Sequence, residues 1–342
     1  MEKNTKALIL VAVMTLFCLL LASCGKQMPG EQEGKGKEVI LKTATYVTPT
    51  YKDYFYIYKG FVDYVNEKGK GKIKIDFHHS GTLLTADQLL PGLMQGTADI
   101  IIPTDSNIMN TLPVFGICQL PFAFKGMDDF HEKTKMGTPV FELINQELSK
   151  KNLYMIGYVI ASENYLWTKK PVRKPEDAKG LRIRGSGSID AQAIEKIGAA
   201  SVHISSAELY EALQRGIIDG LITYEGTISA RNLQQLVKYC TKEPFSFFGA
   251  PILICLDKWQ KLPKDVREIL TEAGKEYGNS YLYAVKVLEE EHRPAIKKAG
   301  VQIIELTSEE EKRFIEITLP VWDWWKKQVP QEVAEKGMKL IE

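Results

Sequence analysis

The chain has 342 residues, of which 44% are hydrophobic and 25% are charged. This composition is ordinary for a globular protein, and the length is enough for two lobes with separate hydrophobic cores. The formal net charge is +1 and no basic run is interleaved with aromatic residues, so nothing points to nucleic acid as a partner.

The N-terminus predicts export. Lys3 and Lys6 precede an apolar run at residues 7–21, ALILVAVMTLFCLLL. The run is short for a membrane span and a polar segment follows it, which is typical of a secretory signal peptide. We therefore expect residues 1–23 to be a signal peptide that is removed on export.

The segment LASC at residues 21–24 resembles a bacterial lipobox. This resemblance implies cleavage before Cys24 and attachment of lipid to its thiol, whereas the alternative is a plain signal peptide that contains a cysteine. Residues 24–37 are Gly-rich, charged and without apolar periodicity, so they predict a flexible tether. The folded domain would then begin near Glu38, outside the cytoplasmic membrane.

The folded part opens with alternating strand and helix patterns. Residues 38–47 are β-branched and alternating, which predicts a first strand. Thr48 and Pro49 suit the N-cap and first turn of a helix, and apolar residues at helical spacing follow. Glycines and then KIKIDFHH, within residues 68–79, predict a second strand. Alternation at this spacing predicts a parallel α/β sheet.

Residues 85–104 and 205–224 form an internal repeat. In both segments a capping box is predicted to open a helix, a glycine to end it in the left-handed conformation, and an aspartate and an apolar strand to follow. Pro91 should kink or shorten the first helix. The repeat favours two similar α/β lobes, and the alternative is chance similarity between two βα units. The correspondence pairs Thr85 with Ser205, Gln88 with Glu208, Gly96 with Gly216, and Asp99 with Asp219.

The stretch GLRIRGSGS, residues 180–188, places two arginines on a short strand before a tight turn. Alternation puts Arg182 and Arg184 on one face, and Arg184 lies nearer the carboxyl end, where open α/β sheets bind ligands. The alternative is a surface arginine that pairs with a local acid such as Glu176 or Asp177. GSGS lacks the features of a phosphate or dinucleotide loop, so we expect a turn into a helix capped by Ser188.

Residues 262–300 have a helical pattern for about 30 residues, weakly broken at Gly274 and Gly278. A helix of that length would span ~45 Å, which is enough to bridge two lobes. The short aromatic segment 319–330 is expected to be a packing element. Its tryptophans are expected to belong to the core: Trp322, Trp324 and Trp325.

Signatures of catalysis are scarce. The five histidines are scattered, and there is no HExxH, GxSxG or Walker loop. We therefore predict no catalytic residue, no metal and no cofactor, and we expect that the chain is not an enzyme. Three cysteines besides Cys18 and Cys24 form no CxxC pair and are expected to be small buried hydrophobic residues: Cys118, Cys240 and Cys255.

Four segments together resemble the substrate-binding subunit of the tripartite ATP-independent periplasmic (TRAP) transporters, of the dicarboxylate-binding-protein (DctP) type. They are KPEDAKGLRIRGSG, GAASVHISSAELYEALQRGIIDGLIT, LPFAFKG and LPKDVREILTEAG. The resemblance implies an α/β, two-lobe periplasmic-binding-protein-like fold of type II, with hinge strands and a long interlobe helix, that closes on its ligand. It places residues 38–160 and 250–288 in lobe I, and residues 161–249 and 289–342 in lobe II.

The same resemblance places the family's carboxylate-binding arginine on Arg184, whose planar fork matches a carboxylate. Asn164 stands where the family often has a second arginine. For each of the further candidates, packing is the alternative role, and buried aromatic residues are common in cores. The remaining candidate ligand-binding positions are Tyr46, Thr104 with Asp105 beside it, Trp167, Thr223, Tyr224 and Phe248, with Phe247 close to the hinge.

The resemblance implies a solute-binding protein that delivers an organic acid to a membrane permease. With one arginine kept and a second not evident, we expect a monocarboxylate with an apolar or aromatic body, because a second carboxylate would need another cation. The expected partners are the small and large subunits of a TRAP permease and the membrane, through lipid at Cys24. The alternatives are the receptor of an ATP-driven importer, a sensor-linked binding protein or, least favoured, an extracytoplasmic enzyme.

Overall fold

The structure is a computed structural model that describes residues 37–341, and the residues from Val39 onward form one structural unit. The predictions made for the signal peptide, for Cys24 and for nearly all of the tether lie outside these residues. Within the described range, none of the helices combines the length and the apolar character needed to cross a bilayer.

One mixed sheet organises the unit. Its strands are β1 (Val39–Ala44), β2 (Ile73–His78), β3 (Ile100–Ile101), β4 (Leu153–Thr168), β5 (Arg182–Gly185), β6 (Ala200–His203), β7 (Gly220–Thr223), β8 (Tyr239–Cys255) and β9 (Gln302–Ile304). They lie in the order β2-β1-β3-β8-β4-β7-β5-β6, and β9 pairs with β8. β1 is parallel to β2 and β3, and β5 is parallel to β6 and β7.

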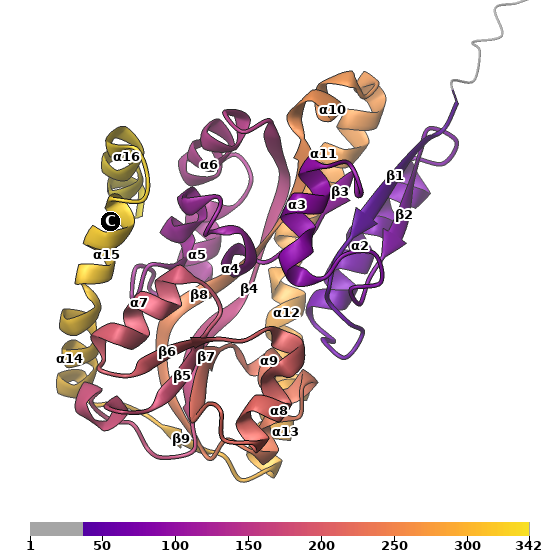
Figure 1. Cartoon of the computed structure of the whole chain (residues 1–342). Coiled ribbons are helices and arrows are strands. Elements are labelled where there is room, and N and C mark those ends of the chain that lie inside the picture. Colours follow the sequence, from indigo (N-terminus) through magenta and orange to yellow (C-terminus); the bar gives the residue numbers. More distant parts are fainter. Residues whose placement is uncertain (1–36, 342) are drawn as a thin grey trace, which may run out of the picture. The chain divides into compact units, whose positions relative to one another are not determined.

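The middle of the sheet is antiparallel, and here the prediction of a parallel sheet is wrong. The cause is two strands of 16 and 17 residues, β4 and β8, which run in opposite directions along each other. Figure 1 shows them passing through the centre of the fold, between the β1–β3 side and the β5–β7 side. Their pairing is interrupted by three register shifts, which bend such strands.

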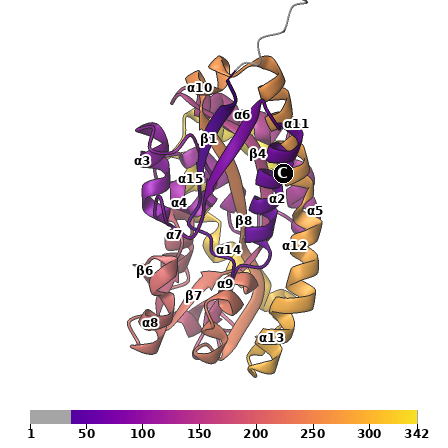
Figure 2. The same cartoon turned by 90° about the vertical axis from the view of Figure 1, so that its right-hand side faces the viewer.

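Helices and short 3₁₀ turns cover the sheet (Figures 1 and 2). Up to β4 they are α2 (Tyr54–Lys68), η1 (Ala86–Gln88), α3 (Leu89–Met94), α4 (Asp105–Ile108), η2 (Pro113–Gln119), α5 (Met127–Thr134) and α6 (Pro139–Ser149). Between β4 and β8 they are η3 (Pro175–Ala178), α7 (Ser188–Lys196), η4 (Ser206–Glu208), α8 (Leu209–Gln214), α9 (Glu225–Ala230) and η5 (Leu233–Gln235). After β8 they are α10 (Leu256–Lys261), α11 (Lys264–Asn279), α12 (Tyr281–Val287), the π-helical turn η6 (Leu288–His292), α13 (Arg293–Lys298), α14 (Ser308–Thr318), α15 (Pro320–Lys326) and α16 (Gln331–Ile341).

Two predicted helix starts are wrong. α2 begins at Tyr54, not near Pro49, and the carboxylate of the preceding residue, Asp53, accepts the backbone N–H of Tyr54 at 2.8 Å. α7 has Gly187 at its N-cap, so Ser188 is the first helical residue. An aspartate inside α7 takes over the capping role, since Asp190 Oδ2 accepts the backbone N–H of Ser186 at 2.9 Å. At both helix starts a carboxylate therefore accepts a backbone N–H group, where the sequence predicted a hydroxyl group in that role.

The two repeat segments fold alike, each as a 3₁₀ turn, a six-residue helix and a strand. Gly96 and Gly216 have positive φ angles of 78° and 66°, as predicted. The capping box is confirmed at Thr85 but is wrong at Ser205, whose hydroxyl bonds the Glu208 carboxylate instead. α3 and α8 are equally short although only α3 contains Pro91, so proline does not set the length of α3.

The two aspartates of the repeat have the same role. Asp99 Oδ2 accepts the backbone N–H of Lys42 at 2.7 Å, and Asp219 Oδ2 accepts that of Arg182 at 2.9 Å. Each carboxylate therefore anchors the start of its own strand to the neighbouring parallel strand.

The long helical segment is confirmed in four consecutive pieces, α11, α12, η6 and α13, which Figure 2 shows along one side of the fold. At Gly274 the backbone of α11 lies directly against the backbone of β4, with no side chain between them. A Cβ on Gly274 would be 2.2 Å from the carbonyl oxygen of Ile156, and a Cβ on Gly157 would be 2.9 Å from Gly274 Cα. Glycine at these two positions allows the helix backbone to touch the long strand directly.

Of the three tryptophans predicted to belong to the core, Trp325 does, whereas Trp322 and Trp324 are only partly buried and pack against it. Trp325 is buried and its indole N–H donates to the carbonyl of Pro113 at 2.8 Å, while Trp322 donates to the carbonyl of Pro121 at 2.9 Å. Trp325 shares a hydrophobic cluster with residues of η2 and α6. Cys118 and Cys240 are buried, as expected, whereas Cys255 at the end of β8 is only partly buried. The predicted lobe boundaries stay a prediction.

Candidate ligand-binding site

A cavity of ≈ 40 Å³ lies at the carboxyl ends of several parallel strands. Tyr46 follows β1, Thr104 follows β3, Arg184 lies in β5, His203 ends β6 and Thr223 ends β7, and all five line the cavity. Open α/β sheets bind ligands at this edge because side chains and free backbone groups from successive loops converge there. The cavity is therefore the candidate ligand-binding site.

Six of the eight candidate ligand-binding residues named from the sequence line this cavity: Arg184, Tyr46, Thr104, Thr223, Tyr224 and Phe248. Asn164 and Trp167 do not line it. The amide of Asn164 donates to Ser246 Oγ at 2.9 Å, and the indole of Trp167 donates to the carbonyl of Thr223 at 2.8 Å. Both side chains are buried, so they hold the long strands and the end of β7 in place behind the site.

Arg184 is the buried cation of the cavity, with 6% of the residue exposed. Its Nε–H donates to the carbonyl of Ile204 at 3.0 Å and its Nη1 donates to the hydroxyl of Ser186. Among residues 37–341 no carboxylate forms an ion pair with Arg184. Its Nη2 also donates no hydrogen bond to any of these residues. Burial lowers the pKa of Arg184, but a guanidinium stays protonated at neutral pH. The site thus offers an anion a desolvated charge with free N–H groups.

Asp190 is the acid whose charge acts most strongly on Arg184, but its oxygens already accept hydrogen bonds from other donors. Its oxygens accept the backbone N–H of Ser186 at 2.9 Å and the hydroxyl of Ser246 at 3.2 Å. Burial raises the pKa of Asp190, while Ser186, Arg184 and Ser246 act in the opposite direction. Ser186 lies between the two charges, so the Asp190 carboxylate acts on Arg184 only at longer range.

Arg182 is a surface arginine that pairs with an acid, which was the alternative to ligand binding. Its Nε and Nη2 each lie 3.0 Å from an oxygen of Asp219, and about half of its side chain is exposed. The hydrogen bond from Arg182 holds the pKa of Asp219 below its usual value. The partner is not one of the two acids named from the sequence, and one of those, Glu176, pairs with Arg313.

Aromatic rings form one wall of the cavity. Tyr224 and Phe248 stack with centroids 5.0 Å apart and planes at 14°, and Tyr54 meets both rings edge-on. Burial raises the pKa of Tyr46, Tyr54 and Tyr224, so their hydroxyls are neutral hydrogen-bond donors. Phe247, the neighbour of Phe248, instead packs between Phe124 and Phe130 in the core.

Sequence reasoning missed a connection across the site. The hydroxyls of Tyr51 and Ser206 lie 3.0 Å apart, although 155 positions separate them, and both residues line the cavity. Arg231 donates from Nε to the Tyr51 hydroxyl at 3.1 Å, with its guanidinium carbon 5.4 Å from the ring centroid. No local sequence pattern relates these two residues, and only the tertiary fold brings them together.

Asp105 supports the cavity from below Thr104. It is fully buried, one of its oxygens accepts the hydroxyl of Tyr158 at 2.5 Å, and the other has no hydrogen-bond partner. Burial raises the pKa of this carboxyl to about 7, although Tyr158 and the backbone of Gly249 on β8 oppose the shift. Near neutral pH the group therefore exchanges between a neutral and a charged form at the long strand.

Comparisons with known proteins agree on one group. Residues 44–328 match the DctP family, described as bacterial extracellular solute-binding protein, family 7. The chain is 26% identical over 319 residues to the C4-dicarboxylate-binding protein DctB of Bacillus subtilis, which covers 91% of this chain and 89% of that protein. Such a match spans nearly the whole described fold.

Solved structures give the same fold. A TRAP periplasmic solute-binding protein of Shewanella oneidensis with bound succinate has a TM-score of 0.80 at 19% identity, covering 89% of this chain and 100% of that chain. DctP7, a Bordetella pertussis extracytoplasmic solute receptor binding pyroglutamic acid, has a TM-score of 0.79 at 20% identity, covering 89% and 99%. The predicted two-lobe, type II fold is thereby confirmed.

The raised pKa of Asp105 predicts a pH-dependent stability. The protonated carboxyl is favoured in the folded state, so its contribution is complete below about pH 4 and is lost as the pH rises through about 7. Asp105→Asn should remove this contribution to the pH dependence, which amounts to at most about 1.4 kcal/mol per pH unit. Urea unfolding of both proteins between pH 5 and 8 measures the difference.

The control is Asp257→Asn, because that carboxyl is exposed and its pKa is lowered. It should leave the slope between pH 5 and 8 unchanged. Parallel pH profiles for the wild type and Asp105→Asn would show that Asp105 has an ordinary pKa.

Proposed function

The chain belongs to the DctP family, family 7 of the bacterial extracellular solute-binding proteins, and from that premise we propose that it captures an organic carboxylate on Arg184 for delivery to a TRAP permease. Proteins of this family bind substrates and are not enzymes. The observation that carries the proposal is the buried guanidinium of Arg184, which has free N–H groups in a cavity and no ion-pair partner among the described residues. A ligand carboxylate would supply the missing negative charge.

The geometry of the donors supports the binding of a carboxylate. Arg184 has a planar fork whose remaining N–H groups can bind two oxygens at once. Tyr46 and Thr104 line the same cavity and offer neutral hydroxyl groups. Carboxylates are also what the similar proteins are named for, succinate and pyroglutamic acid among them.

We further propose a monocarboxylate with an apolar or aromatic body. Arg184 is the one arginine or lysine among the residues that line the cavity, and Asp87 lines it too. A second carboxylate would therefore meet a negative charge at Asp87. The other nearby guanidinium, Arg231, does not line the cavity and its Nε already donates to Tyr51. The stacked rings of Tyr224 and Phe248 suit an apolar group. The cavity has room for only a few waters, so it must widen when a ligand enters, and hinge motion along β4 and β8 provides that.

The proposal includes the partners and location expected from the sequence. The family is extracellular, so the ligand is met outside the cytoplasmic membrane. Lipid at Cys24 would keep the protein near the small and large permease subunits. An ATP-driven importer or a sensor as the partner is not favoured, because family membership points to neither.

The first prediction compares the two arginines of β5. Arg184→Ala should weaken binding of the carboxylate ligand by about 2–5 kcal/mol, which is the range for removing one partner of a buried charge pair. Arg182→Ala should change it by less than about 1 kcal/mol, because its exposed pair with Asp219 lies on the surface. Calorimetry against a panel of organic acids, with circular dichroism to check folding, measures both. Equal losses from the two variants would refute the assignment.

The second prediction concerns Asp87. Replacing it by asparagine removes a negative charge from the cavity wall, so Asp87→Asn should tighten binding of succinate by about fivefold, the value of one exposed charge contact. Binding of a monocarboxylate such as propionate should change by less than twofold. If the wild type already binds succinate more tightly than any monocarboxylate tested, the monocarboxylate proposal fails.

The third prediction concerns the anchor. Cys24→Ser removes the thiol that would carry lipid, so the variant should lose the incorporation of radiolabelled palmitate that the unaltered protein shows. The variant should bind its carboxylate with unchanged affinity, because the substituted residue lies outside the folded unit. Recovery of the unaltered protein in the soluble fraction would contradict lipidation.

A further inference from the structure

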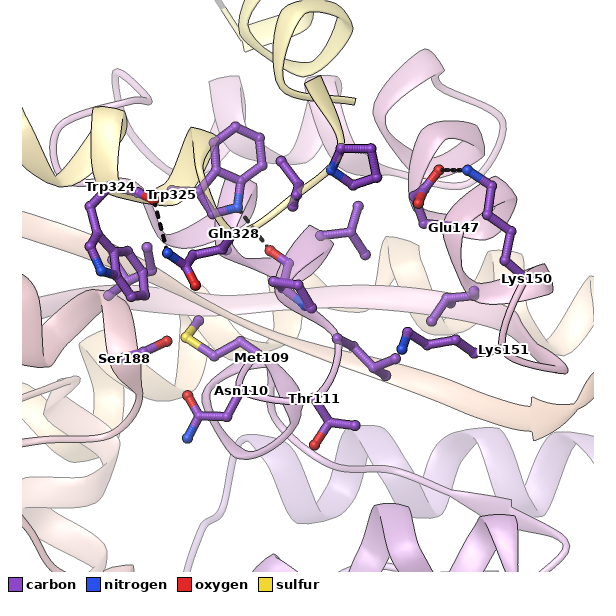
Figure 3. Close-up of a pocket in the computed structure, with 18 residues that line it drawn as sticks. Met109, Asn110, Thr111, Glu147, Lys150, Lys151, Ser188, Trp324, Trp325 and Gln328 are labelled. Carbon is purple, nitrogen blue, oxygen red and sulfur yellow. Dashed lines mark hydrogen bonds and ion pairs between the residues drawn. The ribbon is translucent and has the colours of Figure 1, made fainter. Parts of the chain in front are cut away.

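A second, larger cavity of ≈ 560 Å³ shares no lining residue with the candidate ligand-binding site. Its walls come from four separate segments: the loop after α4 with the start of η2, the end of α6 with the two lysines that follow it, the start of α7, and α15 with the turn that follows it. Figure 3 shows these segments around an open space. The cavity is therefore built by tertiary packing and not by one loop.

The cavity has an apolar wall that includes a partly buried indole whose N–H has no partner among the described residues. Met109, Ile189 and Val329 line it, together with Trp324. Trp322 and Trp325 both donate their indole N–H to a carbonyl, but the indole N–H of Trp324 has no partner among the residues described. Trp324 thus offers an apolar face and a free donor.

The charge in the cavity is unbalanced. Only three of its lining residues are charged: Glu147, Lys150 and Lys151. Lys150 and Glu147 form an ion pair at 2.5 Å, which is drawn as a dashed line in Figure 3. No acid in the described part of the chain pairs with the ammonium group of Lys151. One positive charge is thus available to an anion.

The size of the cavity decides what kind of occupant fits. Small-molecule sites usually have volumes of about 300–1,000 Å³, and this cavity lies inside that range. A stable protein–protein interface buries more than about 1,000 Å² with good complementarity, for which this recess alone is too small. The volume of the cavity therefore suits a small molecule.

We propose that this cavity is a second ligand site, which binds an amphipathic organic anion with its carboxylate at Lys151 and its apolar body against Met109 and Trp324. This second site lies next to the turn at Ser186 and Gly187, which also contacts Arg184 of the candidate ligand-binding site. A Cβ on Gly187 would be 2.8 Å from Met109 Sδ, and Ser186 of the same turn bonds Arg184. The proposal does not depend on the function assigned to Arg184.

The experiment uses octanoate as the probe and the Arg184→Ala protein as the background, so that binding at the first site does not contribute. Calorimetry should find saturable binding with a Kd of about 1 mM or tighter. In that background Lys151→Gln should weaken octanoate binding by about fivefold or more, as expected for loss of one exposed charge contact. Octylammonium should bind at least about fivefold more weakly than octanoate, because Lys151 repels it.

Lys150→Gln is the matched control, because the neighbouring lysine is already paired with Glu147. It should change octanoate affinity by less than about twofold. The proposal is overturned if octanoate does not bind saturably when Arg184 is alanine, if the two lysine variants lose equal affinity, or if octylammonium binds as well as octanoate.

Discussion

A guanidinium that is buried without an ion-pair partner is costly, and the rest of the site is arranged around that cost. Arg184 donates hydrogen bonds to the carbonyl of Ile204 and the hydroxyl of Ser186. The Asp190 carboxylate, which accepts the backbone N–H of Ser186, lowers the electrostatic potential at the guanidinium. None of these contacts neutralises the charge directly. A carboxylate can do so, which makes ligand binding the step that completes the electrostatics of the cavity.

The fold supplies this arrangement through strand direction. Parallel strands on both sides of the sheet end at the same edge, so residues far apart in sequence meet there. The antiparallel pair β4 and β8 connects the two sides and brings Tyr51 within hydrogen-bond distance of Ser206. Glycines at the contact between α11 and β4 let the long helix follow the strand closely. In the proposed hinge motion, movement of one side relative to the other would open or close the cavity around Arg184.

Features that depend on local pattern could be predicted from the sequence. Alternation separated Arg184 from Ile183, the repeat predicted two matching βα units, and the left-handed glycines followed from their spacing. Features that depend on tertiary competition could not. Asp53 and Asp190 took over caps assigned to hydroxyl residues, and the register of β4 turned Asn164 and Trp167 into the packing behind the site. The antiparallel centre followed from two long strands that no local pattern distinguishes from shorter ones.

The central claim is that Arg184 holds a ligand carboxylate in an aromatic cavity. The most direct measurement is to purify the protein from its native host without added ligand, denature it, and identify the released small molecules by mass spectrometry. The account predicts one dominant monocarboxylic acid at a near-stoichiometric level, which is absent from Arg184→Ala protein prepared in parallel. Release of a compound without a carboxylate, or of the same compound from both proteins, would contradict it.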